Sequence, residues 1–379
     1  MTKLFVLSLS LILLMIAAFP ALQLQDTLSE QYPADINCYE FLRYSGGQEI
    51  LSLDAVIRAD NNWSILLACL GGKTREELRA IGLDVTESQL MLLSVMRFVE
   101  VKKEAGLEKI VTTLPILGVN KKKALIQRVR SVAREAEPVV RDDLSLLMKT
   151  LKDAGHDDRA FSIFFSAVID ALVWFPLRAK GYVSVFALSP QKPLFDGTYW
   201  AYTPKRDFRC GTNIALGQDV YVILNWSDGP REKIQQAFNW TNLRLLHDDL
   251  VQHGRVVQEV LKRQLAAYGI FDDAGRLTVP VIEMKENDPV FPICQSLATK
   301  IAEFIGQNSK LNPEILMEEF DFADKEQAFV AAYHEWMWEF MGYLEERGLV
   351  KKPLAFVDPG SAQPRDIGRL LFVIKGALK

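Results

Sequence analysis

The feature that most constrains the fold of this 379-residue chain is a pattern that recurs about 165 positions later. Leu114-Pro115-Ile116 is matched by Val279-Pro280-Val281. An Ala-Gly turn precedes each proline, at Ala105-Gly106 in the first case and at Ala274-Gly275 in the second. Self-similarity at a long period is the sequence signature of a chain built from copies of one unit.

Two more pairs of positions keep the same spacing from these prolines. Asn62-Trp63-Ser64 lies 53 positions before the first proline, and Asn225-Trp226-Ser227 lies 55 positions before the second. Gly181 follows the first proline by 66 positions, and Gly348 follows the second by 68. Because the spacings agree within two residues on both sides, we predict a tandem duplication. The expected repeats are residues 38–205 and 206–379.

Residues 62–117 of the first repeat show three short helical stretches followed by a strand-turn-strand pattern. Thr74 and Thr86 are each placed to cap a helix, and Glu77 completes a capping box with Thr74. This order of three helices and a hairpin resembles the winged helix-turn-helix superfamily. Residues 225–282 of the second repeat resemble it more weakly, with three helices and a hairpin expected from Ile270 to Ile282.

The remainder of each repeat, residues 120–181 and 290–348, has the 3.6-residue periodicity of helices. We expect the apolar segment Phe329–Leu344 to be the buried central helix of the second repeat, equivalent to Phe161–Phe175 in the first. The predicted fold class is mainly α with short β-hairpins (α+β), in two tandem winged-helix-like plus helical-bundle repeats. Further strands are expected at Glu49–Ile57, Val183–Leu188, Gln218–Leu224 and Leu354–Val357.

The N-terminus carries an uncharged run, Leu4–Leu22, directly after Lys3. This pattern is typical of a secretory signal peptide over residues 1–25. An uncleaved anchor is the alternative, because about 20 apolar residues span a bilayer. The cation precedes the run and Asp26 follows it, so the rest of the chain is expected outside the cytoplasm. We predict a secreted or periplasmic protein, with a membrane-anchored form facing outside as the alternative.

The net charge limits the classes of partner that the chain would attract, and the cysteine content limits the disulfides that it could form. The 44 basic and 48 acidic side chains give a net charge of -4, which provides no overall attraction to nucleic acid. An oxidising compartment permits disulfides among the four cysteines. Cys210 and Cys294 lie in polar, turn-rich surroundings and are the candidates for a pair, whereas Cys69 lies in an apolar stretch and is expected to be a buried thiol.

Metal chemistry has one candidate centre. His334 and Glu335 begin a pattern that resembles the zincin motif, but Trp338 occupies the place of its second histidine. A metal site would therefore need His247 or His253 as further ligands, because zinc takes three or four protein ligands. The competing interpretation is a core helix whose histidine and glutamate have buried partners.

No other catalytic signature is present: the sequence has no nucleophile elbow, phosphate-binding glycine loop or Cys-x-x-Cys motif. The third helix of the winged-helix-like segment, Thr86–Phe98, carries Arg97 as its one cation, which is unusual for a DNA-reading helix. We therefore expect an exported, non-enzymatic binding or assembly module with no cofactor, whose partner is a protein or a small ligand and not nucleic acid. The alternatives are a metal-assisted hydrolase centred on His334 and Glu335 and a membrane-tethered nucleic-acid-binding regulator.

Overall fold

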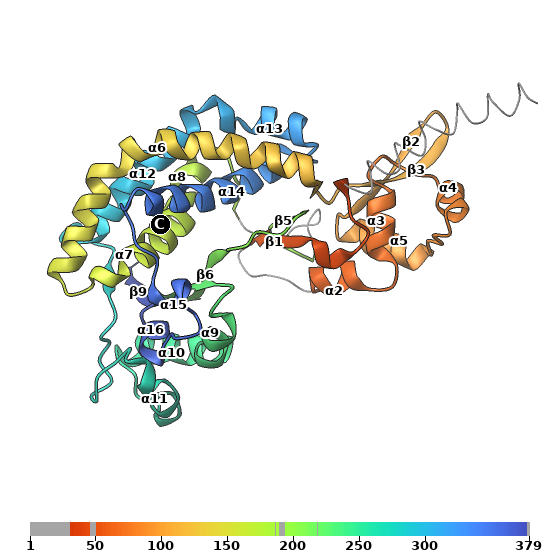
Figure 1. Ribbon diagram of the computed structural model, residues 1–379. Coiled ribbons are helices and arrows are strands. Elements are labelled where there is room, and N and C mark those ends of the chain that lie inside the picture. The colour runs from red at the N-terminus through yellow and green to blue at the C-terminus, as the bar shows by residue number, and fades with distance from the viewer. Residues whose placement is uncertain (1–30, 46–50, 186, 189–193, 218, 377–379) are drawn as a thin grey trace, which may run out of the picture. The chain divides into compact units, whose positions relative to one another are not determined.

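The structure is a computed structural model that describes residues 31–45, 51–185, 187–188, 194–217 and 219–376 (Figure 1). The expected signal peptide or anchor lies outside these residues. Helices account for 54% and strands for 15%, in several small sheets, so the fold is mixed α and β. The described residues form two compact units. Unit 1 consists of those in Met1–Leu125, Val185–Arg206 and Leu316–Ala331, and unit 2 of those in Ile126–Ser184, Asp207–Ile315 and Ala332–Lys379.

These units interleave along the chain and differ from the predicted consecutive halves. Residues 126–184 belong to unit 2 although they were expected in the first repeat, and residues 316–331 belong to unit 1. Three helices include residues of both units, namely α6 (Val119–Asp153), α13 (Pro313–Phe320) and α14 (Lys325–Glu346).

Unit 1 contains a small sheet and a group of short helices that precede a hairpin. Strands β1 (Glu40–Tyr44) and β5 (Thr198–Tyr202) are antiparallel, and β4 (Ile116–Leu117) runs parallel to β5, which gives the order β1-β5-β4. The hairpin pairs β2 (Val99–Glu104) with β3 (Leu107–Thr112). The helical elements are η1 (Ile36–Cys38), α2 (Leu53–Arg58), α3 (Asn62–Ala68), α4 (Arg75–Ala80) and α5 (Glu87–Val95).

The local signals for α4 and α5 are confirmed. Thr74 accepts a hydrogen bond from the Glu77 amide, and the Glu77 carboxylate accepts one from the Thr74 amide. Thr86 and Gln89 form a second capping box that starts α5. Trp63 lies in the unit 1 core, with its ring edge-on to Tyr39 at a centroid distance of 4.6 Å. Burial of such aromatic side chains stabilises a domain strongly.

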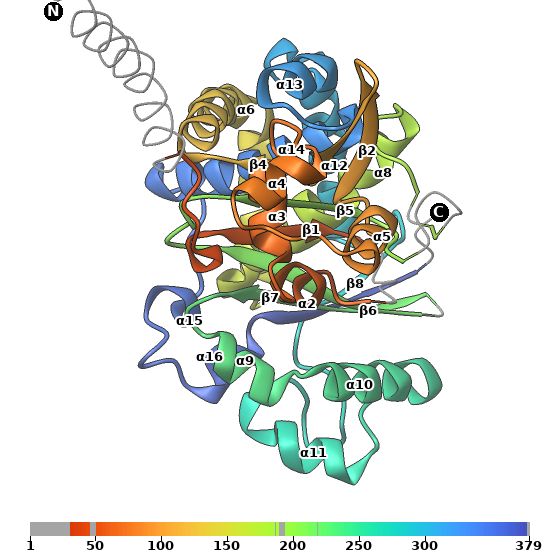
Figure 2. The same cartoon turned by 90° about the vertical axis from the view of Figure 1, so that its right-hand side faces the viewer.

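Unit 2 contains a sheet of order β6-β7-β9-β8. Its strands are β6 (Cys210–Gly217), β7 (Val220–Ser227), β8 (Val281–Glu283) and β9 (Leu371–Lys375). Helix α10 (Trp240–His253) packs against β6 and β7, and Figure 2 shows it beside α9 (Arg231–Ala237) and α11 (Glu259–Leu265). The remaining helical elements are η2 (Asp157–Arg159), α7 (Ala160–Ser162), η3 (Ile163–Leu172), α8 (Trp174–Ala179), η4 (Ala266–Tyr268), α12 (Phe291–Gln307), η5 (Ser309–Leu311), α15 (Leu354–Val357) and α16 (Pro364–Gly368).

The expected burial of α14 is confirmed. Trp336 is fully buried and stacks on Phe340 at a centroid distance of 4.8 Å, and the Tyr333 hydroxyl donates to the Ile169 carbonyl at 2.8 Å. The segment expected as its counterpart is largely a π-helix, η3, which is a rare conformation often found at functional positions. By length and composition, Asp157–Ala179 is apolar enough to cross a membrane, with a mean hydropathy of 1.9, but 78% of that stretch is buried within the structure.

Each matched proline precedes an edge strand, β4 after Pro115 and β8 after Pro280. Each of these strands pairs in parallel with the strand of its sheet that comes last in the sequence, β5 or β9. The Pro115 carbonyl accepts from the Ala201 amide at 2.9 Å, and the Pro280 carbonyl accepts from the Val373 amide at 3.0 Å. The predicted hairpins would include both prolines, and that placement is wrong: Pro115 follows β3, and Pro280 lies beyond the bridge between Phe271 and Leu277. An edge strand tolerates proline because its outward side needs no amide donor. Gly181 and Gly348 each end a helix with a left-handed φ, of 77° and 69°.

Other predicted matches and strands differ from the structure. Asn62 begins helix α3, whereas Asn225 lies in strand β7, so the repeated tripeptide falls on unlike elements. The hairpin expected from Ile270 to Ile282 is reduced to a single bridge between Phe271 and Leu277.

Two of the expected strands are helices. Leu53–Arg58 is α2, because Ser52 caps it and its buried residues have helical spacing. Leu354–Val357 is α15. The described part of Val183–Leu188 has no strand, Glu49 and Ile50 lie outside the described residues, and the strand predicted from Gln218 is β7.

Candidate functional site

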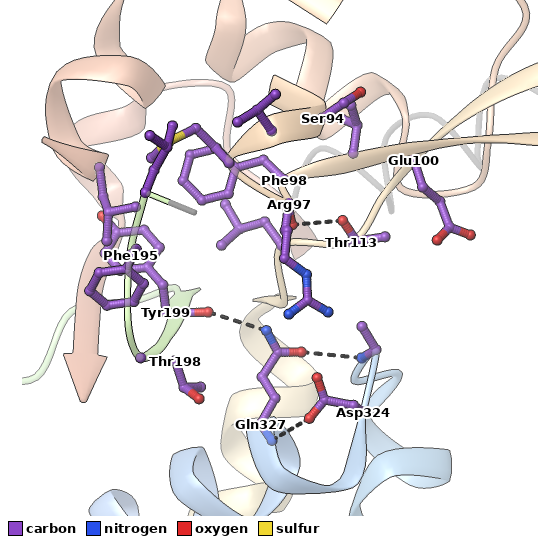
Figure 3. A pocket seen from close by; sticks show the side chains of 18 residues that line it. Ser94, Arg97, Phe98, Glu100, Thr113, Phe195, Thr198, Tyr199, Asp324 and Gln327 are labelled. Carbon is purple, nitrogen blue, oxygen red and sulfur yellow. Dashed lines mark hydrogen bonds between the residues drawn. The ribbon is translucent and has the colours of Figure 1, made fainter. Parts of the chain in front are cut away.

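A pocket of about 300 Å³ opens in unit 1 (Figure 3). Five separate segments form it: the start of α2, the end of α5 with the start of β2, the turn after β3, the residues at the start of β5, and the residues at the start of α14. Its labelled lining residues are Ser94, Arg97, Phe98, Glu100, Thr113, Phe195, Thr198, Tyr199, Asp324 and Gln327. A concave site with a few polar groups is the usual form of a small-ligand site.

Arg97 occupies the turn that joins α5 to β2 and has a left-handed φ of 60°. Residues other than glycine persist in this backbone conformation only when the surrounding structure stabilises it. The Phe98 amide donates to the Leu93 carbonyl at 2.8 Å, and the Thr113 hydroxyl donates to the Arg97 carbonyl at 2.8 Å. The exposed guanidinium is directed toward Gln327 across the pocket (Figure 3). These contacts therefore fix the backbone position from which the Arg97 side chain extends.

The opposite wall is the start of α14. Asp324 precedes the helix, and its Oδ1 accepts a hydrogen bond from the Gln327 amide at 2.8 Å, as a helix cap does. The Gln327 side chain accepts from the Ala323 amide at 3.3 Å and approaches the Tyr199 carbonyl at 3.4 Å. These contacts join the helix start to β5 and hold the Asp324 carboxylate at the pocket.

The charges of the pocket do not neutralise one another. Glu100 pairs with Lys102, at a distance of 2.7 Å between the amine nitrogen and a carboxylate oxygen. Arg97 and Asp324 line the same pocket, yet neither forms an ion pair within the described chain. Opposite charges that line one concave site suit binding of a charged molecule.

The predicted metal ligands are not brought together. His334 and Glu335 are buried in α14, where the His334 ring packs 5.6 Å from that of Trp174. The His247 ring lies 3.0 Å from the Gly217 carbonyl, and His253 is exposed at the end of α10. The described residues hold no group of three histidine, cysteine, aspartate or glutamate side chains arranged for a metal, so the predicted site is wrong for this part of the chain. The core-helix interpretation of His334 and Glu335 agrees with their burial.

The predicted disulfide is likewise not formed. Cys210 begins β6 and Cys294 lies in α12, and the structure holds both as thiols. Burial raises the pKa of Cys294 to about 12, which keeps it protonated and unreactive. Cys69 is a buried thiol, as predicted, and burial raises its pKa to about 11.

One titratable group of unit 2 was missed by the sequence reasoning. Asp170 lies in η3, where desolvation raises the pKa of its carboxyl to about 7, against the opposing effect of hydrogen bonds with Thr212 and Trp174. Asp170 is the one charged residue of the apolar segment Phe161–Phe175, and that isolation was a signal in the sequence. It does not belong to the pocket of unit 1.

Comparison of the chain with known protein families, with characterised proteins and with solved structures finds no match in any of the three. The functional argument therefore depends on the residues and their geometry.

Proposed function

We propose that the chain is an exported, non-enzymatic binding module and that the pocket of unit 1 holds its ligand. The observation that carries this proposal is that Arg97 and Asp324 line one pocket and form no ion pair with any residue that the structure describes. Charged groups in a concave site interact strongly with a bound ligand because the surrounding protein excludes part of the solvent. The sequence has no nucleophile elbow, phosphate-binding glycine loop or Cys-x-x-Cys motif, which supports binding over catalysis.

The partner in this proposal is not nucleic acid. Helix α5 has no lysine or arginine, and its exposed residues include the apolar Met91 and Val95. Affinity for nucleic acid comes largely from cations that contact phosphates. The nucleic-acid-binding regulator therefore has little support, and the metal-assisted hydrolase has no metal site among the described residues.

We also propose that the fold consists of two winged-helix-like repeats that arose by duplication. The order β1-β5-β4 and the order β7-β9-β8 share the same parallel and antiparallel pairings. Pro115 and Pro280 precede equivalent strands in these orders. The two Asn-Trp-Ser tripeptides lie in a helix and in a strand. The segments of the two repeats that precede the prolines therefore do not align residue by residue.

The pocket is tested with a variant that fills it and a control on the same helix. Ser94→Trp places an indole in the pocket, whereas Ser88→Trp places one on the exposed side of α5. The probes are amino acids, dicarboxylates, sugar phosphates and polyamines, and the readout is the melting temperature, which rises when a ligand binds the folded state. We expect at least one probe to stabilise the parent chain and Ser88→Trp but not Ser94→Trp. A panel without effect, or an effect that survives Ser94→Trp, overturns the proposal.

Export has its own test. Phosphatase and cytoplasmic reporters are fused separately to the C-terminus, and the phosphatase should be active because Lys3 precedes the apolar run and Asp26 follows it. An inactive phosphatase with an active cytoplasmic reporter contradicts export.

A further inference from the structure

The pocket of unit 1 presents one positive and one negative group. The backbone of Arg97 is fixed by the Phe98 and Thr113 hydrogen bonds, and its side chain is exposed. Asp324 is oriented by the bond from the Gln327 amide to its Oδ1, and its second oxygen has no hydrogen bond within the described chain. A carboxylate oriented in this way binds a ligand with a smaller loss of entropy than a mobile one.

Each charge selects a different chemical group. A guanidinium binds a carboxylate through two parallel hydrogen bonds. A carboxylate such as Asp324 attracts an ammonium group, whose three N–H bonds all donate. Glu100 is paired with Lys102 and therefore adds little net charge to the pocket.

A ligand with a single charge would satisfy one of these groups and be repelled by the other. A simple anion would gain from Arg97 and lose from Asp324, and a simple cation the reverse. A molecule with both charges matches both groups. Phe195, Phe98 and Tyr199 add aromatic surface to the same lining, which suits an apolar substituent. The volume of about 300 Å³ lies at the lower end of the range for ligand pockets and therefore favours a small molecule.

We infer that the pocket binds a free amino acid with an apolar side chain, its carboxylate on Arg97 and its ammonium group toward Asp324. This inference rests on the proposed function of the pocket and names the ligand class. A peptide retains only one of the two charged groups at each end, so a free amino acid is the better match.

Three probes with the same side chain test the inference on the full chain by isothermal titration calorimetry. L-leucine carries both charges, N-acetyl-L-leucine lacks the ammonium group, and L-leucinamide lacks the carboxylate. We expect L-leucine to bind, and each analogue to bind more weakly by about tenfold or more, as loss of a charge-assisted hydrogen bond predicts. Equal binding of all three probes overturns the inference.

Two variants assign the contacts. Arg97→Gln removes the cation from an exposed position, and Asp324→Asn removes the anion while asparagine keeps the helix cap. Arg97→Gln should weaken binding of L-leucine and leave that of L-leucinamide unchanged or stronger. Asp324→Asn should weaken binding of L-leucine and leave that of N-acetyl-L-leucine unchanged or stronger. The control is Arg79→Gln, because Arg79 lies on α4 near Asp84 and outside the pocket. Variants that bind L-leucine as the control does contradict the assignment.

The outcome also separates this inference from the proposed function. If sugar phosphates or polyamines stabilise the parent chain and amino acids do not, the pocket is a binding site and the amino-acid inference is wrong. If no probe stabilises the chain, both are wrong.

Discussion

Unit 1 and unit 2 each place a proline directly before a short edge strand, but the segments that lead into these prolines differ. In unit 1 the chain forms the full hairpin β2–β3, with six residues in each strand, before it reaches Pro115. In unit 2 the corresponding turn at Ala274-Gly275 retains one bridge, and Arg276 instead pairs with Asp272 at 2.7 Å. Thr113, which follows the full hairpin, lines the pocket. The two sheets thus share their strand pairings and differ in the segments that precede their edge strands.

The largest effect is expected in the unit 2 core. Trp336→Ala removes a fully buried indole and should lower the free energy of unfolding by about 3 to 5 kcal/mol. Trp240→Ala is the matched control, because Trp240 is 57% exposed, and it should change stability by less than about 0.5 kcal/mol. Chemical denaturation of both variants measures the difference. Similar losses in the two variants would show that unit 2 does not depend on the aromatic stripe of α14.

The desolvated carboxyl of Asp170, in unit 2, predicts a pH dependence of stability. The pKa of Asp170 is raised to about 7, above the value of about 3.9 for an unfolded chain, so the native state holds the proton more tightly. The contribution of Asp170 to the free energy of unfolding is therefore complete below about pH 4 and is lost as the pH rises to about 7. The free energy of unfolding falls over this range by at most about 1.4 kcal/mol per pH unit.

Asp170→Asn should remove this slope, and Asp142→Asn, which changes an exposed carboxyl of α6, should leave it in place. Denaturation at a series of pH values measures both. An unchanged slope in Asp170→Asn means that another group is responsible.

Substitutions in the two Asn-Trp-Ser tripeptides test whether the two units are also similar in the segments that precede their prolines. Asn62 donates to the Val56 carbonyl at 2.7 Å, and Asn225 donates to the Gly211 carbonyl at 3.1 Å, both from buried positions. Each change to alanine should cost about 1 to 3 kcal/mol, because it leaves a buried backbone acceptor without its donor. Asn239→Ala changes the exposed asparagine of the remaining Asn-Trp-Thr sequence and should cost about 1 kcal/mol through loss of its helix cap. A negligible loss at either buried position contradicts its structural role.

The smallest expected effects are at the helix-ending glycines. Gly181→Ala and Gly348→Ala should each cost about 1 kcal/mol, because alanine is strained at their positive φ although the space around them is open. Gly342→Ala, inside α14, also meets open space and should stabilise the chain by up to about 1 kcal/mol. Thermal unfolding distinguishes the signs. Unequal costs at the two terminal glycines would weaken the proposed equivalence of the repeats.

The sequence predicted those features whose signals are local. The caps at Thr74 and Thr86, the hairpin after Phe98 and the buried stripe of α14 depend on residues a few positions apart. It did not predict the sheets, because β4 pairs with a strand more than 80 positions later, at Ala201 and Tyr202. A two-residue strand such as β4 has too few residues to show a period of two.

The candidate site was missed for the same reason. Arg97 was recognised as the one cation of its helix, but nothing near it in sequence indicates Asp324, which reaches the pocket from the start of α14. The predicted ligands His334 and Glu335 belong to a different part of that helix and are buried among aromatic rings. The spacing of residues in a motif predicts which side chains are neighbours on one helix. A pocket is lined by residues from several segments, which such spacing does not predict.

The interleaving of the two units also sets an order for synthesis. Residues 126–184 and 207–315 belong to unit 2 and are made before the last segment of unit 1, Leu316–Ala331. The pocket therefore lacks one wall until Gln327 has been added, although its other walls are complete by Tyr199. A nascent or prematurely terminated chain of about 300 residues would contain Arg97 without Asp324. The pocket can thus be completed only when Gln327 has been added, and such late closure of distant contacts is a recognised cause of slow folding.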